Sequence, residues 1–552
     1  MYKFLFLIFS TALFSTEIDK SFLLYLLHKN QIGKCISNYQ VYSYENNEDD
    51  YTILGEIGMS LLEKGIDSDD IDTQTLSLLG ASLSANMRSF DILKKGFLKK
   101  EPKIQMLALH FLSRIEDERV DDLLIHAMRS PYLPIRMEAA FYLSEKKHSH
   151  AVGQVEALMH RLPAQFRPFF PSLFALNGTN EAIAIMKRLI HDPNTYVRIE
   201  SIHALLKHNR DDFLPTIRKR LVASSSQEKE ICCLAAGFFQ DKESIPKLEK
   251  LSLSKNSEIS LAAMKALYLL GKTSYQTKIE SLALTKNLFA INALSELKGS
   301  EDTLYILTFD RDIQVRINAT YALLKRKDPR VVEKIEELLF HDQRELAFAP
   351  VSSLGKAHMA FRCISNSYQD TKNRRINLPL SFAIKEKFLE EAMYLDYKTF
   401  LKIAEKLFKK EQNPLIPQLV ALLQNLKGTE AIDLLKKYAH KPGAPLIRTY
   451  CQLALFKLKE DGPYQEKVFQ FIEKNINHEL IELQPILSWN ERVMEHSYRL
   501  TNKETTQLLV DCFSALAERK NKKSIHCILD AIKSGNPKNR YALAGLLLRA
   551  VE

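Results

Sequence analysis

Few residues of this 552-residue chain stand at spacings that support chemistry. His148 and His150 form the one close histidine pair, separated by a serine and preceded by Lys146 and Lys147. Imidazoles are good metal ligands, but a protein metal site needs three or four ligands, and no third one stands nearby in the sequence. We therefore interpret the pair as part of a solvated turn, and we expect no metal and no other cofactor.

The seven cysteines are scattered and odd in number, which argues weakly against a disulfide framework. Cys232 and Cys233 are adjacent, so they lack the two-residue gap of a zinc knuckle. Free cysteine packs as a small buried hydrophobe, so we expect packing rather than metal or redox roles. The positions are Cys35, Cys232, Cys233, Cys363, Cys451, Cys512 and Cys527.

Catalytic signatures are missing from the sequence. It has no phosphate-binding glycine loop, no Gly-x-Ser-x-Gly elbow and no His-Glu-x-x-His motif. The one tryptophan, Trp489, stands before Asn490, Glu491 and Arg492, and a core or interface role accounts for it. We therefore expect no catalytic residues, no cofactor-binding residues and a protein that is not an enzyme.

Positive charge is the remaining chemical signal. Lys and Arg number 77 against 67 Asp and Glu, a mild net charge of +10. Such an excess supports nucleic-acid binding only where it gathers on one face. Acids are interleaved, and cations at helix C-termini favour the helix dipole, so solvated helix ends are the preferred interpretation. The clusters are Lys94/Lys95/Lys99/Lys100/Lys103, Arg218/Lys219/Arg220, Lys325/Arg326/Lys327/Arg330 and Arg519/Lys520/Lys522/Lys523.

The elements that carry these residues repeat along the chain. An arginine recurs between an apolar residue and an apolar run, and Arg136 and Arg198 lie 62 residues apart, which is twice 31. A fixed period of this size predicts one supersecondary unit copied many times. Extending the register predicts roughly 16 units. We call the position of this arginine in each unit the phase position. The residues assigned to it are Gln74, Gln105, Arg136, Arg167, Arg198, Glu230, Ser260, Asn287, Arg316, Pro417, Arg448, a position near His478, Leu509 and Arg540.

Each unit is expected to be a pair of helices. Apolar residues follow the phase position at plus one, four and seven, as in Ile199, Ile202 and Leu205, and this spacing places them on one helical face. A turn such as 192–194 precedes that helix, and a second apolar run, 181–190, precedes the turn. Two helices and two turns fill the period without room for a strand. The fold class is therefore all-α, an α-solenoid of roughly 16 stacked antiparallel helix pairs.

The position three residues after the phase residue is usually small, which lets neighbouring helices approach closely. Arg167 is followed by Pro168 and Pro171, so that second helix must start late or kink. The residues at this position, called the small-residue column below, are Ser77, Ala108, Ala139, Ser201, Cys233, Ala263, Ala290, Ala319, Cys451 and Cys512, with Phe170, Val420 and Leu543 as exceptions.

The turns at 130–136, 192–198 and 310–316, each followed by an Ala/Leu-rich helix, resemble HEAT repeats. The short period is similar to that of the bacterial HEAT-like class, also called the phycobilisome-lyase type, and the resemblance covers roughly residues 70–550. It implies a binding scaffold. It also implies that the turn Asp and helix Arg link successive units, here Asp192 with Arg198 and Asp310 and Asp312 with Arg316. Glu230, Ser260 and Asn287 replace the arginine, so such a ladder is interrupted there.

The N-terminal segment predicts export. Lys3 precedes the apolar stretch 4–14, which is too short to span a membrane, and small residues follow at 15 and 16. We interpret residues 1–16 as a signal peptide, with a buried first helix as the alternative. The protein is then exported, periplasmic or secreted, and otherwise cytoplasmic. No transmembrane segment is expected.

The register divides the rest of the chain into four segments. Residues 17–70 are expected to form an N-terminal helical cap, and 71–345 the regular repeats. Residues 346–413 are expected to form irregular repeats with an exposed loop at 369–375, and 414–552 the C-terminal repeats.

Two functional classes follow from this organisation. The leading one is a non-enzymatic scaffold that binds a protein partner through the concave face of the solenoid. The alternative is a nucleic-acid-binding array. The resemblance to HEAT-like proteins implies two enzymatic forms: such an array that excises alkylated bases and, less expected, a bilin-lyase-like enzyme. The sequence specifies neither the partner nor the oligomeric state. Six residues are expected to point toward a ligand or a neighbouring unit: Arg198, Glu200, His203, Arg316, Asn318 and Tyr321.

Overall fold

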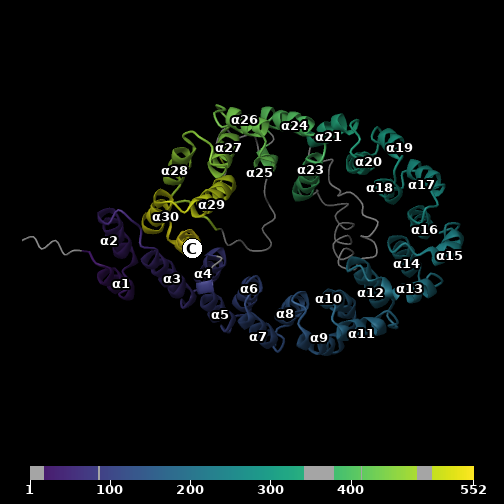
Figure 1. Ribbon diagram of the computed structural model, residues 1–552, viewed down its shortest axis with the longest axis horizontal. Helices are drawn as coiled ribbons and strands as arrows, with labels where there is room; N and C mark the ends of the chain where they lie inside the picture. The colour runs from purple at the N-terminus through teal and green to yellow at the C-terminus, as the bar shows by residue number, and fades with distance from the viewer. Residues whose placement is uncertain (1–17, 85–86, 341–377, 412, 482–499, 501) are drawn as a thin grey trace, which may run out of the picture. The chain divides into compact units, whose positions relative to one another are not determined.

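A computed structural model describes residues 18–84, 87–340, 378–411, 413–481, 500 and 502–552 (Figure 1). In these residues the regular structure consists of α-helices and short 3-10 helices, and no strand occurs among them. The predicted all-α solenoid is therefore confirmed. No helix in these ranges is both long and apolar enough to cross a bilayer. The predicted signal peptide, the loop at 369–375, Cys363 and Trp489 lie outside the described residues.

The chain folds as two compact units. The first comprises residues 1–115, 461–490 and 500–552, and the second comprises 116–460 and 491–499. This division does not follow the predicted segment boundaries at 70 and 345, because it joins the first and the last helices of the chain in one unit.

The described helices of the first unit come from both ends of the sequence. They are α1 (Lys20–His28), α2 (Ile32–Glu45), α3 (Tyr51–Ile66), α4 (Ile71–Ser84), α5 (Phe90–Phe97), α6 (Pro102–Leu112), α28 (Tyr464–Lys474), α29 (Asn502–Arg519), α30 (Lys522–Ser534) and α31 (Arg540–Val551).

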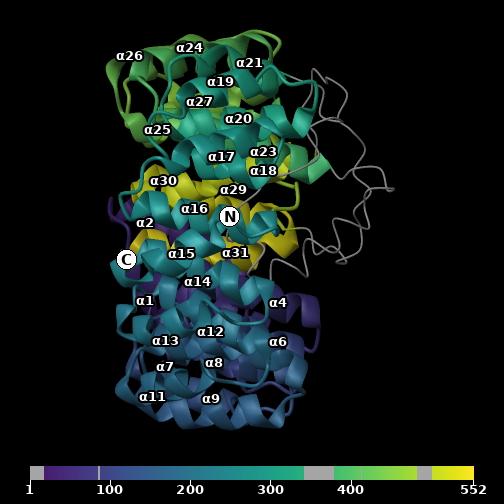
Figure 2. The same ribbon diagram turned by 90° about the vertical axis from the view of Figure 1, so that its right-hand side faces the viewer.

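The second unit carries the most regular repeats, in which α12, α14 and α16 stack one on the next (Figures 1 and 2). Its described helices are α7 (Glu118–Ala127), α8 (Leu133–Glu145), α9 (Ser149–Arg161), α10 (Phe170–Asn177), α11 (Asn180–Leu189), α12 (Thr195–Lys207), α13 (Leu214–Arg220), α14 (Ser226–Phe238), α15 (Ile245–Leu251), α16 (Ser257–Leu269), α17 (Tyr275–Leu284), α18 (Leu288–Leu294), α19 (Glu301–Leu307), α20 (Ile313–Lys325), α21 (Val331–Phe340), α23 (Leu378–Ala392), α24 (Tyr397–Lys409), α25 (Ile416–Leu426), α26 (Thr429–Tyr438) and α27 (Pro445–Lys457).

The small-residue column lies where the helices pack. All ten small members, from Ser77 to Cys512, are 0% exposed, and the larger Phe170, Val420 and Leu543 are buried too. The predicted packing role of this column is confirmed. The late start after Arg167 is also confirmed: a 3-10 helix covers 164–169, and α10 begins at Phe170 with Pro171 in its first turn.

The phase residue has a local role that explains its recurrence. At five positions its side chain donates a hydrogen bond to the carbonyl oxygen six residues earlier, which ties the start of the second helix to the turn. The donors and distances are Gln74 to Ser68 (2.6 Å), Gln105 to Lys99 (2.6 Å), Arg136 to Ser130 (3.0 Å), Arg198 to Asp192 (2.8 Å) and Arg316 to Asp310 (3.0 Å).

The prediction that Asn287 occupies the phase position of its unit is wrong. Asn287 is the N-cap of α18, and its side chain accepts from the backbone N–H groups of Phe289 and Ala290. The phase residue of this unit therefore belongs inside the helix, not ahead of it. The error arises because α18 and its partner α19 are only 7 residues each, so the period shortens here.

Candidate functional site

The predicted link between a turn aspartate and a helix arginine takes a different form in the structure. Arg198 bonds to the backbone oxygen of Asp192, inside one unit, and reaches the next unit through Glu228 of α14, with Nη2 to Oε2 at 2.7 Å. The Asp192 carboxylate instead accepts the N–H of Asn194, which caps α12. Arg198 therefore does link successive units, but through Glu228, and the Asp192 carboxylate is used inside its own turn.

The second link that the resemblance implied, between Asp310, Asp312 and Arg316, also has different partners in the structure. Arg316 donates to the backbone oxygens of Asp310 and Arg311, and Asp312 caps α20. The Asp310 carboxylate does join two units, but its partner is Lys286 at 3.0 Å. Bonds to Lys286 and to the N–H of Asp312 lower the pKa of Asp310, the N–H being the larger cause.

Glu228 is the centre of a buried ion cluster. Its side chain is 1% exposed and receives Arg198 from α12 and Arg220 from α13, the latter at 2.7 Å. Burial alone would raise the pKa of Glu228, but the two arginines outweigh it and the pKa lies below its ordinary value. The cluster joins successive units and is a structural feature rather than an open binding site.

The other expected ligand-facing residues also bond within the helical array. Glu200 is buried and lies 3.9 Å from His203. Asn318 donates to the backbone oxygen of Gln314 at 2.8 Å. Tyr321 donates to Glu391 at 3.2 Å, and burial, with this carboxylate, raises the pKa of the tyrosine. These contacts lie within one helix for Glu200, His203 and Asn318, and between α20 and α23 for Tyr321.

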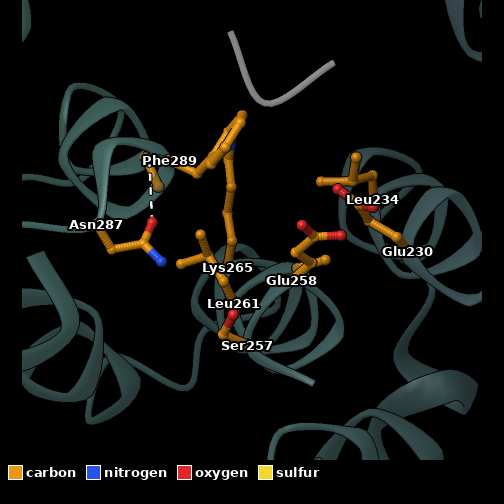
Figure 3. A pocket seen from close by; sticks show the side chains of 10 residues that line it. Glu230, Leu234, Ser257, Glu258, Leu261, Lys265, Asn287 and Phe289 are labelled. Atoms are coloured by element: carbon orange, nitrogen blue, oxygen red, sulfur yellow. Dashed lines mark hydrogen bonds between the residues drawn. The ribbon is translucent and has the colours of Figure 1, made fainter. Parts of the chain in front are cut away.

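A cavity opens on the second helices α14, α16 and α18, where the arginine column is interrupted (Figure 3). Glu230 and Glu258 lie on one side of it, Asn287 and Phe289 on the other, and Lys265 between them. Its volume is about 20 Å³. It is lined by Glu230, Leu234, Ser257, Glu258, Leu261, Ala262, Lys265, Asn287, Phe289 and Ala293.

Three charged side chains border this cavity. Lys265 is only 7% exposed and is paired with Glu296 of the next unit at 2.8 Å. Glu230 and Glu258 also border the cavity, and each has interactions within the protein. Leu234, Leu261 and Phe289 supply apolar walls. Such a lining suits the cationic end of a side chain whose stem is apolar.

The sequence did not identify this place. Glu230, a departure from the arginine column, lines the cavity. Asn287 lines it too, but as the N-cap of α18 it does not belong to that column. Lys265 was missed, because one lysine in an apolar helix has no distinguishing spacing.

The cysteines in the described part of the chain are free thiols. Five cysteines there are buried and Cys527 is half-buried, all as free thiols. Burial raises the pKa of the Cys35 thiol to about 12. No group of three His, Cys, Asp or Glu side chains in that part is placed to hold a metal ion.

The arginines of two predicted basic clusters are paired with acidic side chains. Arg218 binds Asp241 and Glu243, and Arg220 binds Glu228. In the next cluster Arg326 pairs with Glu301, and Arg330 pairs with Asp302 and Asp328. The arginines of these two clusters therefore hold the array together and offer little charge to phosphates.

Comparison with known proteins gives helical-repeat structures at low similarity. Neither a protein-family model nor a curated protein sequence matches the chain. The complex of CpcE and CpcF of phycocyanin lyase from Nostoc sp. is 18% identical, with a TM-score of 0.30, over 39% of this chain and 92% of that chain. Yeast importin-beta (Kap95p) is 12% identical, with a TM-score of 0.31, over 96% and 86%.

A homology model of the full-length AP-3 complex is 14% identical, with a TM-score of 0.32, and covers 94% of each chain. At these TM-scores the overall superposition is loose, so the fold is assigned from this chain's own helices. The chain is an all-α helical-repeat protein, an α-solenoid.

Proposed function

We propose that this chain is a non-enzymatic scaffold that binds a protein partner through its second helices, at the cavity on α14, α16 and α18. The observation that carries the proposal is the apolar-walled cavity that Glu230, Glu258 and Phe289 border on three successive units. These second helices lie on the inner side of the curve that the repeats of the second unit follow (Figure 1).

The cavity favours a basic side chain of a protein as its occupant. Lysine and arginine carry an apolar stem beneath a charged head, which matches leucine and phenylalanine walls beside two carboxylates. Arginine anchors are also enriched among the residues that dominate protein–protein binding energy. A partner with one exposed arginine or lysine on a helix or loop fits this place.

The size of the cavity argues against an enzymatic role at this place. Ligand and cofactor sites usually measure about 300–1,000 Å³. A cavity of about 20 Å³ takes only the end group of one side chain, such as a lysine ammonium, while the stem stays outside it. A bilin chromophore or an extruded base needs far more room, so a lyase or base-excision role is not favoured here.

A charge reversal tests the scaffold proposal. Glu258 borders the cavity, and we expect Glu258→Lys to repel the basic side chain of the partner. The tagged full-length chain is cross-linked in its native cells, and bound proteins are quantified by mass spectrometry. At least one protein recovered with the wild type should fall by about tenfold, because like-charge contacts cost a few kcal/mol.

The matched control is Glu249→Lys, which makes the same charge change at an exposed residue of the first helix α15. This control should retain every partner, and circular dichroism should show both variants folded. Recovery of one unchanged set of proteins from wild type, Glu258→Lys and control would contradict the proposal.

The location of the protein is part of the same proposal. The segment 1–16 supports export, as an apolar stretch followed by small residues. Sequencing the N-terminus of the protein purified from its native cells should give a start near residue 17. A mature chain that retains Met1 would contradict cleavage.

A further inference from the structure

The last helix of the sequence, α31, packs against helices from both ends of the sequence. Helix α31 packs against α29 and α30, which precede it, and also against α3 and α4 near the N-terminus. Of its 12 residues, the eight buried ones include Leu543, Ala544, Leu547 and Leu548. A helix that is apolar all round belongs in the middle of a core, so α31 is an internal helix of the first unit although it ends the sequence.

Glycines allow α31 to approach the N-terminal helices. A Cβ at Gly545 would overlap the carbonyl oxygen of Gly80 on α4, and a Cβ at Gly58 on α3 would lie 2.8 Å from Leu548. The ring of Tyr541 covers Gly65, where a Cβ would lie 2.6 Å from it. Backbone contacts this close tolerate no larger side chain, so the two ends fit each other specifically.

Polar bonds join the same two ends beside the apolar contact. His526 of α30 lies 3.0 Å from the Asp49 carboxylate, and Ser43 of α2 donates to that carboxylate at 2.6 Å. Lys522 donates to the backbone oxygen of Ser43 at 2.9 Å, and Gln40 donates to Asp530 at 2.7 Å. Ser43 is 0% exposed, so this Ser–His–Asp group holds the ends together and is not an open catalytic site.

The two ends therefore replace the caps that a repeat array normally needs. Terminal repeats usually carry a polar outer face that keeps them soluble. Here α3 and α4 bury apolar surface against α31 instead. Each end of the chain covers the other, although the two ends are joined covalently only through the whole second unit.

We propose that this closure is exchangeable, and that a second copy of this chain is the partner that the opened ends fit. In a repeat array each unit contacts chiefly its neighbours, so the closure can open without loss of the other interfaces. The surface on α3 and α4 differs from the surface on α31, which makes the contact heterologous, and such a contact can join copies as well as ends. Helices α29–α31 of one chain would then pack on α2–α4 of another.

Concentration should decide between the two arrangements. Within one chain the ends meet at an effective concentration on the order of millimolar. A single chain therefore closes on itself at micromolar concentration, and exchange requires opening first. The proposal does not depend on the cavity of the second unit.

Cross-linking of full-length chains tests the exchange. Gln40 and Asp530 are hydrogen-bonded across the closure. We replace them by Cys, singly and together, in chains in which Cys363 and Cys527 are changed to Ser. The double variant, Gln40→Cys with Asp530→Cys, should cross-link within one chain under a short bis-maleimide. A mixture of the two single variants, opened briefly in urea and returned to buffer, should give a covalent dimer whose yield rises with protein concentration.

Two matched mixtures separate exchange from aggregation. Gln40→Cys chains alone should give about tenfold less covalent dimer, since two α2 helices are not partners in this interface. Adding Gly545→Leu to the Asp530→Cys chain should abolish the dimer, because the new side chain meets the Gly80 backbone. The inference is overturned if the double variant cross-links within one chain while the mixture stays monomeric at every concentration. Failure of both reactions overturns the closure itself.

Discussion

At the scale of single residues, the charged side chains of this protein serve mainly to join repeats. Glu228 shows this most clearly, because it is nearly fully buried between Arg198 and Arg220 from two different helices. Removing one partner of a buried ion pair leaves the other charge uncompensated, which costs more than the pair contributes. The arginine column is therefore a set of structural contacts whose consequences are measurable as stability.

We expect Glu228→Gln to lower the free energy of unfolding by about 3 kcal/mol at pH 7, because two half-buried guanidinium groups lose their carboxylate. The measurement is urea unfolding followed by circular dichroism. As the pKa of Glu228 is lowered in the folded chain, its contribution is present above the unfolded pKa of about 4.3 and is lost as pH falls through the folded value. The difference between wild type and variant should therefore shrink in acid.

The control for this measurement is Glu243→Gln. Glu243 also pairs with an arginine, Arg218, at 2.6 Å, but its side chain is 75% exposed. Exposed pairs contribute about 0–1 kcal/mol, so this variant should unfold close to the wild-type midpoint. Equal losses in the two variants would show that burial of Glu228 is not what matters.

At the scale of helices, the sequence predicted the features that recur in every unit. The period, the helix pairs and the small-residue column follow from spacing alone, and Cys233 and Ala263 are fully buried as expected. The register failed at Asn287, where short helices break the period. The bond from Arg198 to Glu228 was also missed. A repeated turn motif does not show which side chain of the next unit will accept a hydrogen bond from the arginine.

The small-residue column makes a prediction of its own. Gly237 on α14 lies so close to α16 that a Cβ there would be 2.7 Å from the Cα of Ala266. Cys233 stands four residues earlier, on the same face of α14. We expect Cys233→Leu to destabilise the chain by about 1–3 kcal/mol through overpacking. Urea unfolding should show it, with Ser226→Leu on the exposed start of α14 as the control.

Helix α14 must keep its helical content in both variants for that comparison to hold. A Cys233→Leu chain that unfolds at the wild-type midpoint would mean that α14 and α16 can separate without cost. The predicted packing role of the column would then be wrong at this position.

At the scale of the whole molecule, the sequence was silent about contacts between distant residues. Asp49 and His526 are separated by 477 positions and still meet at 3.0 Å. A period states that each unit touches the next one, and it says nothing about whether the first helices touch the last. The cavity on α14, α16 and α18 was equally hidden, because its residues come from three units whose relative placement the period does not fix.

Net charge is also a property of the whole molecule, and here it predicts weak binding to nucleic acid. The chain carries a net charge of +10, yet Arg218, Arg220, Arg326 and Arg330 are all paired with acids. Phosphate binding by these groups would require breaking bonds that join the repeats. In fluorescence anisotropy with duplex DNA at about 150 mM salt, we expect a Kd no tighter than about 10⁻⁵ M, within the range of nonspecific binding.

The exposed lysines near α5 are an exception to this pairing. Lys94 and Lys100 lie on the surface of the first unit, so Lys94→Glu with Lys100→Glu removes positive charge that is accessible to a phosphate. Because little phosphate binding is expected, this double variant should leave the anisotropy curve unchanged. Tight binding that falls by several powers of ten between 50 and 200 mM salt, and that disappears in the double variant, would instead favour a nucleic-acid-binding array.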